Sequence, residues 1–232
     1  MHAFVSRALR RRWPSFAFAV ALVAVLAPAP AARAQSAGSS LSPAPVSATA
    51  AQPAPMFVVD LVDRVSGAAR DPALSPADRQ AKVRGLVNRG FDLPAISRFV
   101  LGRHWRTASE SERAQFSAAF TDYMVALYAR QMANYGGEAF TVTGQRADSD
   151  VVTVFTRVAQ RDGGAPIGID WRTVKAADGY RITDVVVEGI SMMQTKRDEI
   201  GAVIARSGGG LDGMIADLRD KTGEAVTAPG PQ

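Results

Sequence analysis

Hydrophobic residues recur three and four positions apart in the first half of the chain, which is the spacing of an amphipathic helix. The strongest pattern begins at Ser109, which forms a capping box with Glu112, and ends at Gly136 and Gly137. Earlier helices are predicted over 56–69, from Ser75 onward, and over 92–102. We therefore expect a helical first half.

The pattern then changes to short runs rich in β-branched and aromatic residues. Separated by turn residues such as Asp-Gly, these runs predict four consecutive strands. The runs cover 139–146, 150–158, 166–174 and 180–190. In the third run, Ile167, Ile169 and Trp171 fall on one face, opposite Asp170 and Arg172. Two further helices are predicted over 191–206 and 211–221.

Consecutive strands with tight connections form an antiparallel meander, and helices before and after it are typical of an α+β fold. We predict a curved four-stranded antiparallel sheet wrapped by six or seven helices. The apolar stripe of the long helix, from Phe116 to Tyr128, faces the apolar side of that sheet. Two interpretations stay open: an ordinary filled core, or an unfilled apolar cavity between sheet and helices.

The first 34 residues have the three parts of a secretory signal. Four arginines between positions 7 and 12 precede an apolar run over 16–27, and Ala32-Arg33-Ala34 supplies small residues for cleavage. The run is shorter than the roughly 20 residues that cross a bilayer. We expect a cleaved signal peptide over 1–34, a flexible Ala/Pro/Ser-rich linker over 35–55, a folded domain over 56–222 and a disordered tail over 223–232.

The net charge of +5 comes from the expected signal peptide. Five of the 27 basic residues and none of the 22 acidic residues lie in 1–34, so the rest of the chain carries 22 of each. A balanced surface gives no long-range attraction to a polyanion. Although Ser97–Thr107 interleaves arginines with aromatic rings, we expect no nucleic-acid binding.

Few residues are suited to catalysis. The chain has no cysteine, which excludes a thiol nucleophile, and His104 is the one histidine outside 1–34. Its arginine neighbours disfavour the imidazolium that a general base must form. The glycines of 208–213 have a dinucleotide-binding spacing but follow a predicted helix rather than a strand. We expect no enzyme, no catalytic residue, no metal and no cofactor.

Three segments carry longer motifs. Residues 96–129 include an R-x-x-L-G-x-x-W motif and the long helix, and 180–200 include the string D-V-V-V-E-G-I-S. Residues 208–218 read GGGLDGMIADL. In this order, the segments resemble the MlaC (toluene-tolerance) family of periplasmic phospholipid-binding carrier proteins.

The resemblance implies a cystatin-like curved sheet and an apolar cavity between sheet and helices. It implies a soluble periplasmic carrier that holds the tails of a diacyl phospholipid and shuttles it between outer- and inner-membrane transport complexes, maintaining outer-membrane lipid asymmetry. The implied partners are an inner-membrane ABC transporter complex with its lipid-binding ring protein, and an outer-membrane lipoprotein–porin complex. We expect a monomer. A cavity-containing periplasmic enzyme of a related curved-sheet fold and a lipid-free adaptor of the same complexes remain alternatives.

The expected cavity lining combines the helix stripe with apolar residues of the sheet and of the junction after it. It comprises Phe116, Phe120, Tyr123, Met124, Leu127, Phe140, Val154, Ile169, Trp171, Val187, Ile190 and Met192. Four residues are expected to border the cavity mouth or to dock on a partner: Arg98, Arg103, Trp105 and Arg106. The alternative is that these arginines are solvated and pair with acids such as Glu110 and Glu112.

Overall fold

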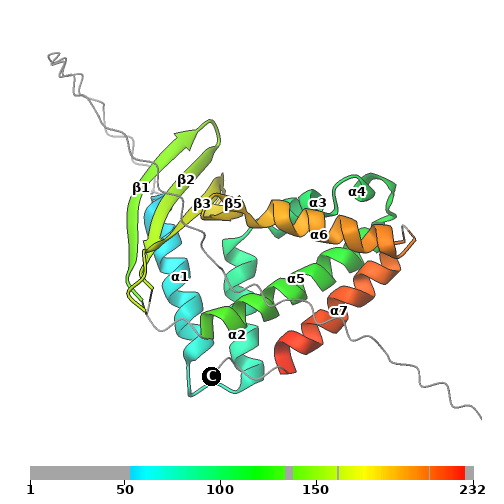
Figure 1. The fold of residues 1–232 in the computed structure, drawn as a ribbon, viewed down its shortest axis with the longest axis horizontal. Coiled ribbons are helices and arrows are strands. Elements are labelled where there is room, and N and C mark those ends of the chain that lie inside the picture. The colour runs from blue at the N-terminus through cyan, green and yellow to red at the C-terminus, as the bar shows by residue number, and fades with distance from the viewer. Residues whose placement is uncertain (1–52, 134–137, 161, 209, 228–232) are drawn as a thin grey trace, which may run out of the picture. The chain divides into compact units, whose positions relative to one another are not determined.

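The computed structural model describes residues 53–133, 138–160, 162–208 and 210–227. In this part of the chain, five helices precede five strands, and two helices follow (Figure 1). The first helices are α1 (Ala54–Arg70), α2 (Pro76–Gly90), α3 (Leu93–Leu101), α4 (His104–Thr107) and α5 (Glu110–Ala133). The strands are β1 (Phe140–Asp148), β2 (Val151–Val158), β3 (Ile167–Ala176), β4 (Gly179–Val187) and β5 (Ile190–Ser191). The last helices are α6 (Met192–Arg206) and α7 (Leu211–Thr227). The α+β prediction is confirmed.

Local sequence signals set where the helices begin and end. Ser75 caps α2, because its hydroxyl oxygen accepts a hydrogen bond from the Asp78 N–H at 3.1 Å. The predicted capping box opens α5: the Ser109 hydroxyl accepts from the Glu112 N–H at 3.2 Å, and the Glu112 carboxylate accepts from the Ser109 N–H at 2.7 Å. Helix α3 stops at Gly102, whose φ of 58° favours glycine.

The strands form one antiparallel sheet in the order β1-β2-β3-β4-β5. Side chains alternate between the faces of a strand, so residues paired across neighbouring strands share a face. We call the face with Ile167, Ile169 and Trp171 the inner face; Asp170 and Arg172 lie on the other, as predicted. The inner face has four rows: Phe140–Val158–Ile167, Val142–Thr156–Ile169–Val187–Ile190, Gln145–Val154–Trp171–Val185, and Ala147–Val152–Thr173–Ile182.

Helices α1, α2 and α5 cover the third and fourth rows. Val154, Thr173 and Ile182 are fully buried there. Val58 of α1 packs in one core cluster with Val154, and Val125 of α5 packs in another with Ile182. From β2 to β4 this half of the inner face is therefore a filled core, whereas Gln145 and Ala147 of β1 are exposed.

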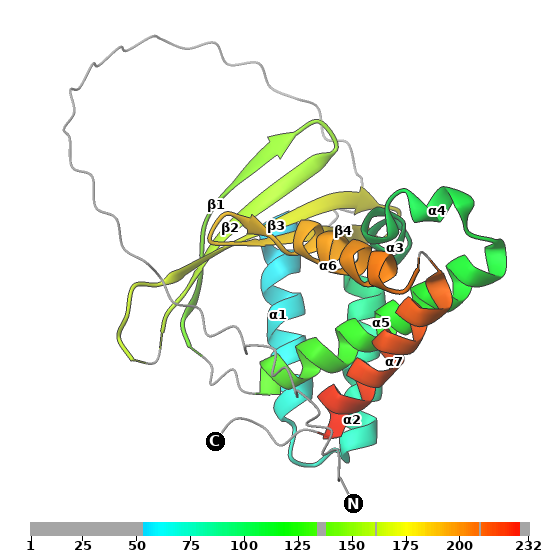
Figure 2. The same ribbon diagram turned by 45° about the vertical axis from the view of Figure 1, so that its right-hand side comes forward.

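A second core lies between α3, α5, α6 and α7, and its buried residues come from these helices, apart from Ala108 between α4 and α5. Figure 2 shows α7 running alongside α5. The fully buried rings of Phe116 and Phe120 stack here, with centroids 5.8 Å apart. Met214 and Ile204 from the last two helices are equally buried. The long helix thus contributes to a core on each side of it.

The predicted last strand, 180–190, is divided in the structure. Glu188 and Gly189 have φ angles of 48° and 82°, and this pair of left-handed residues makes a two-residue hairpin turn. The chain after the turn pairs back through Ile190 and Ser191, so the sheet has five strands rather than four.

The ends of the domain also differ slightly from the sequence prediction. Helix α1 begins at Ala54, within the predicted linker, and α7 continues to Thr227, within the predicted tail. The predicted signal peptide over 1–34 lies outside the described residues and stays a prediction. Within the residues that are described, no helix is both long and apolar enough to cross a membrane.

Candidate functional site

Two rows of the inner face, at the end of the sheet where β5 lies, are only partly covered by other elements. We call their apolar side chains the open half of the sheet. Ile190 is 55% exposed, and the other members are half-buried. The open half consists of Phe140, Val142, Val158, Ile167, Ile169, Val187 and Ile190. A contiguous, partly exposed apolar surface of this kind is typical of a binding site.

The one polar residue in these two rows, Thr156, has its hydroxyl satisfied internally. The hydroxyl donates to the Ile169 carbonyl oxygen at 2.7 Å and accepts from Trp171 Nε1–H at 3.0 Å. The Trp171 ring meets Phe140 edge-on, with centroids 6.3 Å apart, where the covered and open halves join. The Thr156 hydroxyl is therefore paired within the protein, and the surface of the open half is hydrocarbon.

A buried carboxylate connects the sheet to the start of α6. Asp184 is 8% exposed and accepts three hydrogen bonds: from Ser191 Oγ at 2.7 Å, Arg172 Nη1 at 3.1 Å and the Met193 N–H at 3.2 Å. Ser191 in turn caps α6 by accepting from the Gln194 N–H at 3.0 Å. The first and last letters of the D-V-V-V-E-G-I-S string thus form a structural junction.

The glutamate of the same string holds the hairpin in place. The Glu188 carboxylate accepts a hydrogen bond from the Gly168 N–H, and the Glu188 N–H donates to the Gly168 carbonyl oxygen at 3.0 Å. A glutamate at φ 48° is strained, and these two bonds to β3 offset that strain. Glu188 and Asp184 together fix Ile190 at the border of the open half.

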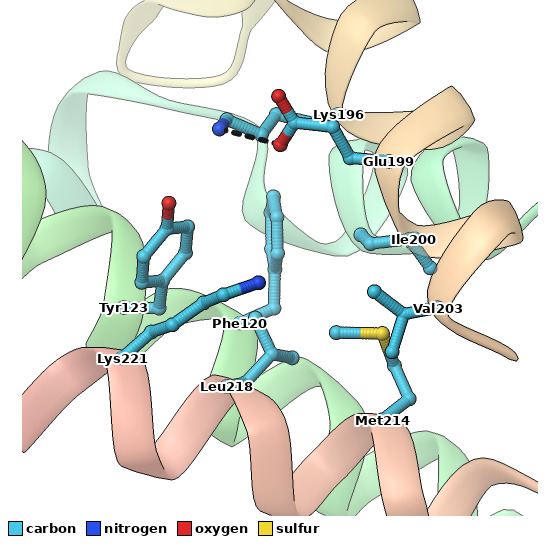
Figure 3. A pocket seen from close by; sticks show the side chains of 9 residues that line it. All are labelled: Phe120, Tyr123, Lys196, Glu199, Ile200, Val203, Met214, Leu218 and Lys221. Atoms are coloured by element: carbon cyan, nitrogen blue, oxygen red, sulfur yellow. Dashed lines mark hydrogen bonds and ion pairs between the residues drawn. The ribbon is translucent and has the colours of Figure 1, made fainter. Parts of the chain in front are cut away.

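A pocket with a volume of about 20 Å³ lies between α5, α6 and α7 (Figure 3), with room for roughly one water. Figure 3 shows Phe120 at its centre, with the pair Lys196–Glu199 on one side and Lys221 on another. The apolar lining residues are buried, whereas Glu199 and Lys221 are partly exposed at the rim. The lining comprises Phe120, Tyr123, Lys196, Glu199, Ile200, Val203, Met214, Leu218 and Lys221.

Lys196 carries the buried charge of this pocket. Its Nζ donates to Glu199 Oε2 at 2.8 Å and lies 5.5 Å from the centroid of the Tyr123 ring. Burial disfavours the ammonium, but interactions with Glu199 and Tyr123 outweigh burial and raise the pKa of Lys196 above its ordinary value. Nearby, burial raises the pKa of Tyr128 to about 12. At neutral pH the pocket therefore holds a paired ammonium, and Tyr128 of α5 is an uncharged phenol.

The structure distributes the predicted lining residues over three places. Phe116, Phe120, Met124 and Val154 are buried in cores, although Phe120 also lines the pocket. Phe140, Ile169, Val187 and Ile190 belong to the open half, with Trp171 at its border. Tyr123, Leu127 and Met192 are half-buried on α5 and α6. Which of them contact a ligand stays a prediction.

The predicted docking residues lie at the end of α3 (Arg98), just before α4 (Arg103) and on α4 (Trp105 and Arg106). Arg98, Arg103 and Arg106 are exposed. Trp105 is half-buried, and the Arg113 guanidinium lies 5.6 Å from its ring and donates to its carbonyl oxygen at 2.8 Å.

The two acids expected to pair with these arginines, Glu110 and Glu112, do not do so. Ser109 binds the Glu112 carboxylate, and these hydrogen bonds lower the pKa of Glu112. In the described part of the chain, no ion pair joins Arg98, Arg103 or Arg106 to Glu110 or Glu112. Arg103 Nε donates instead to the neighbouring His104 Nε2 at 3.3 Å, and the side chains of all three arginines are exposed.

Sequence reasoning missed several residues of both features. Val142, Val158 and Ile167 were left out of the expected lining, although their alternation with Phe140 and Ile169 marks them as the same face. Four apolar pocket residues were also missed, because helical spacing does not distinguish a filled core from a pocket wall. These four are Ile200, Val203, Met214 and Leu218. Among the described residues, no group of three or more His, Asp or Glu side chains is placed to hold a metal.

Residues 58–220 match the family model of the MlaC protein. The chain belongs to the MlaC family. The match runs from α1 to α7, so it includes the open half and every lining residue of the α5–α6–α7 pocket except Lys221.

Two known proteins are similar to this MlaC-family chain. One is a phospholipid-binding protein from Ralstonia solanacearum, solved in complex with a phospholipid; it has a TM-score of 0.62 and 24% identity and covers 74% of this chain and 98% of its own. That likeness shows the fold. The other is the intermembrane phospholipid transport system binding protein MlaC of Haemophilus influenzae, which is 22% identical over 132 residues. This match spans 55% of the present chain and 60% of the relative, less than two thirds of its length.

Proposed function

We propose that this protein is a periplasmic phospholipid carrier that holds the acyl tails of a diacyl lipid against the open half of the sheet. The proposal rests on one observation: two rows of apolar side chains lie partly exposed beside a filled core. Membership of the MlaC family and a fold shared with a protein solved with a phospholipid support the same ligand class.

Elementary energetics explains why such a carrier has to cover the tails. Burying one methylene is worth about 0.8 kcal/mol, so exposing two chains of about 14 methylenes each costs on the order of 20 kcal/mol. A lipid therefore crosses an aqueous gap at a useful rate only when a protein shields most of its hydrocarbon. The open half supplies apolar surface that shields the tails. Such a surface makes no polar contact with the headgroup, so we expect weak headgroup selectivity.

In this proposal a cleaved signal peptide directs the chain to the periplasm. There the protein shuttles lipid between an outer-membrane lipoprotein–porin complex and an inner-membrane ABC transporter complex with its lipid-binding ring protein. The exposed guanidinium groups of Arg98, Arg103 and Arg106 dock on an acidic surface of one of these complexes. The proposal includes no catalytic step.

The decisive experiment purifies the mature protein from a bacterial periplasm under mild conditions and identifies its cargo by native mass spectrometry and lipid extraction. Val187→Glu places a carboxylate in the open half, and Val151→Glu is its matched control, because Val151 is a half-buried valine on the other face of the sheet.

We expect one diacyl phospholipid per chain, and an affinity loss on the order of 100-fold in Val187→Glu alone, since a buried, unpaired carboxylate costs several kcal/mol. An empty protein that still supports the outer membrane would favour the lipid-free adaptor. Turnover of an ester or isomerisable substrate would favour the enzyme. Equal lipid loading of the two variants would refute the placement of the tails.

The docking proposal has a separate test. Replacing Arg98, Arg103 and Arg106 together by serine should leave the bound lipid in place and abolish its transfer to membranes that contain the transport complexes. Transfer at the unmodified rate would show that these arginines are solvated only.

A further inference from the structure

Helix α6 carries a strip of side chains that leads from the end of the sheet to the pocket. Met192 follows β5 directly, and Lys196, Ile200 and Val203 recur along the same side of the helix. At 1.5 Å per residue, this strip is about 16 Å long. One leaflet of a bilayer has a hydrocarbon thickness of about 15 Å, half of the full core. The strip therefore matches the length of one acyl chain.

Helix α5 forms the facing wall of this strip. Phe120 and Tyr123 of α5 line the same pocket as Ile200 and Val203 of α6, and Lys196 Nζ lies 5.5 Å from the Tyr123 ring centroid. The two helices thus enclose the far end of the strip from both sides.

The charges that line the pocket are paired with one another or with a neighbouring carboxylate, and the rest of the lining is hydrocarbon. Lys196 is paired with Glu199 at 2.8 Å, and Lys221 is paired with Asp217 at 2.7 Å. Both ammonium groups have carboxylate partners, so neither is a free cation for a lipid phosphate. The buried floor consists of aromatic, aliphatic and methionine side chains (Figure 3).

The walls of the pocket can yield to an entering chain. A volume of about 20 Å³ holds roughly one water, so the chain end has to displace side chains. Met214 is unbranched and fills irregular space in several rotamers. Lys221 contributes a long, flexible stem with a partly exposed end.

We propose that a bound phospholipid separates its two tails. One tail lies on the open half of the sheet, and the other runs along the α6 strip with its methyl end in the pocket between α5, α6 and α7. This inference rests on the proposed function, because it needs a diacyl lipid as cargo. It follows that a lysophospholipid, with one tail, needs only the open half.

The test measures binding of phosphatidylethanolamines with lauroyl, myristoyl, palmitoyl or stearoyl chains, and of their lyso forms, to the delipidated mature protein. Met214→Phe fills the pocket, and Met214→Ala enlarges it. Met193→Ala is the matched control, because Met193 is a buried methionine of the same helical core that does not line the pocket.

Burying one methylene changes an affinity about fourfold, so displacing two from the pocket lowers it about 15-fold. We expect that loss in Met214→Phe for the palmitoyl and stearoyl diacyl lipids, with lyso affinities unchanged. Met214→Ala should shift the preferred diacyl chain toward stearoyl, because the added methylenes fill the enlarged pocket. Met193→Ala should keep the unmodified chain-length profile.

Two results would overturn this inference alone: an unmodified chain-length profile in both Met214 variants, or an equal loss for lyso and diacyl lipids in Met214→Phe. If Met214→Phe does not fold, the chain-length profile of Met214→Ala decides. Failure of the unmodified protein to bind any phospholipid would overturn the proposed function and this inference together.

Discussion

Removing the Asp184 carboxylate should destabilise the protein far more than removing its exposed partner. Asp184→Ala deletes the acceptor of three hydrogen bonds and leaves the buried Met193 N–H without a partner. Hydrogen bonds to a charged group contribute roughly 1.5–3 kcal/mol each, and an exposed ion pair contributes less than about 1 kcal/mol. The Arg172 side chain is 51% exposed, so its bond to Asp184 belongs to the weaker class. We therefore expect Asp184→Ala to lower the free energy of unfolding by about 3–5 kcal/mol.

Urea denaturation followed by circular dichroism measures this loss, with an unchanged m-value as the sign that the folded state stays intact. Asp184→Asn keeps an oxygen that accepts from the Met193 N–H, so it should lose only about 1–2 kcal/mol. Arg172→Gln should lose less than about 1 kcal/mol. Equal losses in the alanine and asparagine variants, or a loss in Arg172→Gln as large as in Asp184→Ala, would refute the assignment of the junction to Asp184.

Three further predictions follow from the contacts of single side chains. Glu112→Ala should destabilise the start of α5 at neutral pH, because the Glu112 carboxylate accepts hydrogen bonds from Ser109 that lower its pKa. Hydrogen exchange should show the difference in stability between the two proteins vanish as the pH falls below 4.5, the ordinary pKa of a glutamate, and a difference that persists at acid pH would contradict this reasoning. Thr156→Val should cost about 1–3 kcal/mol in urea denaturation, because it leaves the Trp171 Nε1–H unpaired; a neutral effect would contradict that reasoning. Tyr128 should ionise near pH 12, and the free energy of unfolding should fall as the pH rises from 10 to 12, because the unfolded chain loses the phenol proton at the lower pH. Ultraviolet absorbance of tyrosinate measures this ionisation, and an ionisation of Tyr128 near pH 10 would contradict the prediction.

The sequence was enough to predict the fold class, because periodicity and turn chemistry act locally. The capping box of Ser109 and Glu112 and the stop at Gly102 appear where the sequence places them. The division of the last strand was not predicted, because Glu188 is an unusual residue for a left-handed turn position and is held there by Gly168 of another strand. The conformational propensities of single residues do not include hydrogen bonds to a distant strand, so they could not predict this turn.

The candidate site was less predictable than the fold. Alternation places Val154 and Ile169 on the same face of the sheet, but Val154 is fully buried while Ile169 is half-buried. That difference depends on where α1 and α5 lie across the sheet, which is a matter of long-range packing. The pocket around Phe120 could not be predicted either, because its walls come from α5 and from the pair α6 and α7, which the whole sheet separates from α5 in the sequence.

Under the proposed function, the half-covered sheet makes the stability of this protein depend on its cargo. A ligand that binds the folded chain alone, at about 100 times its dissociation constant, adds about 2.7 kcal/mol to the free energy of unfolding. Covering the open half with hydrocarbon should also give binding a negative heat-capacity change. Under the proposed function, a carrier that has delivered its lipid is therefore the less stable form. It should also be the form that periplasmic proteases degrade faster. Reloading then protects the protein as well as moving the lipid.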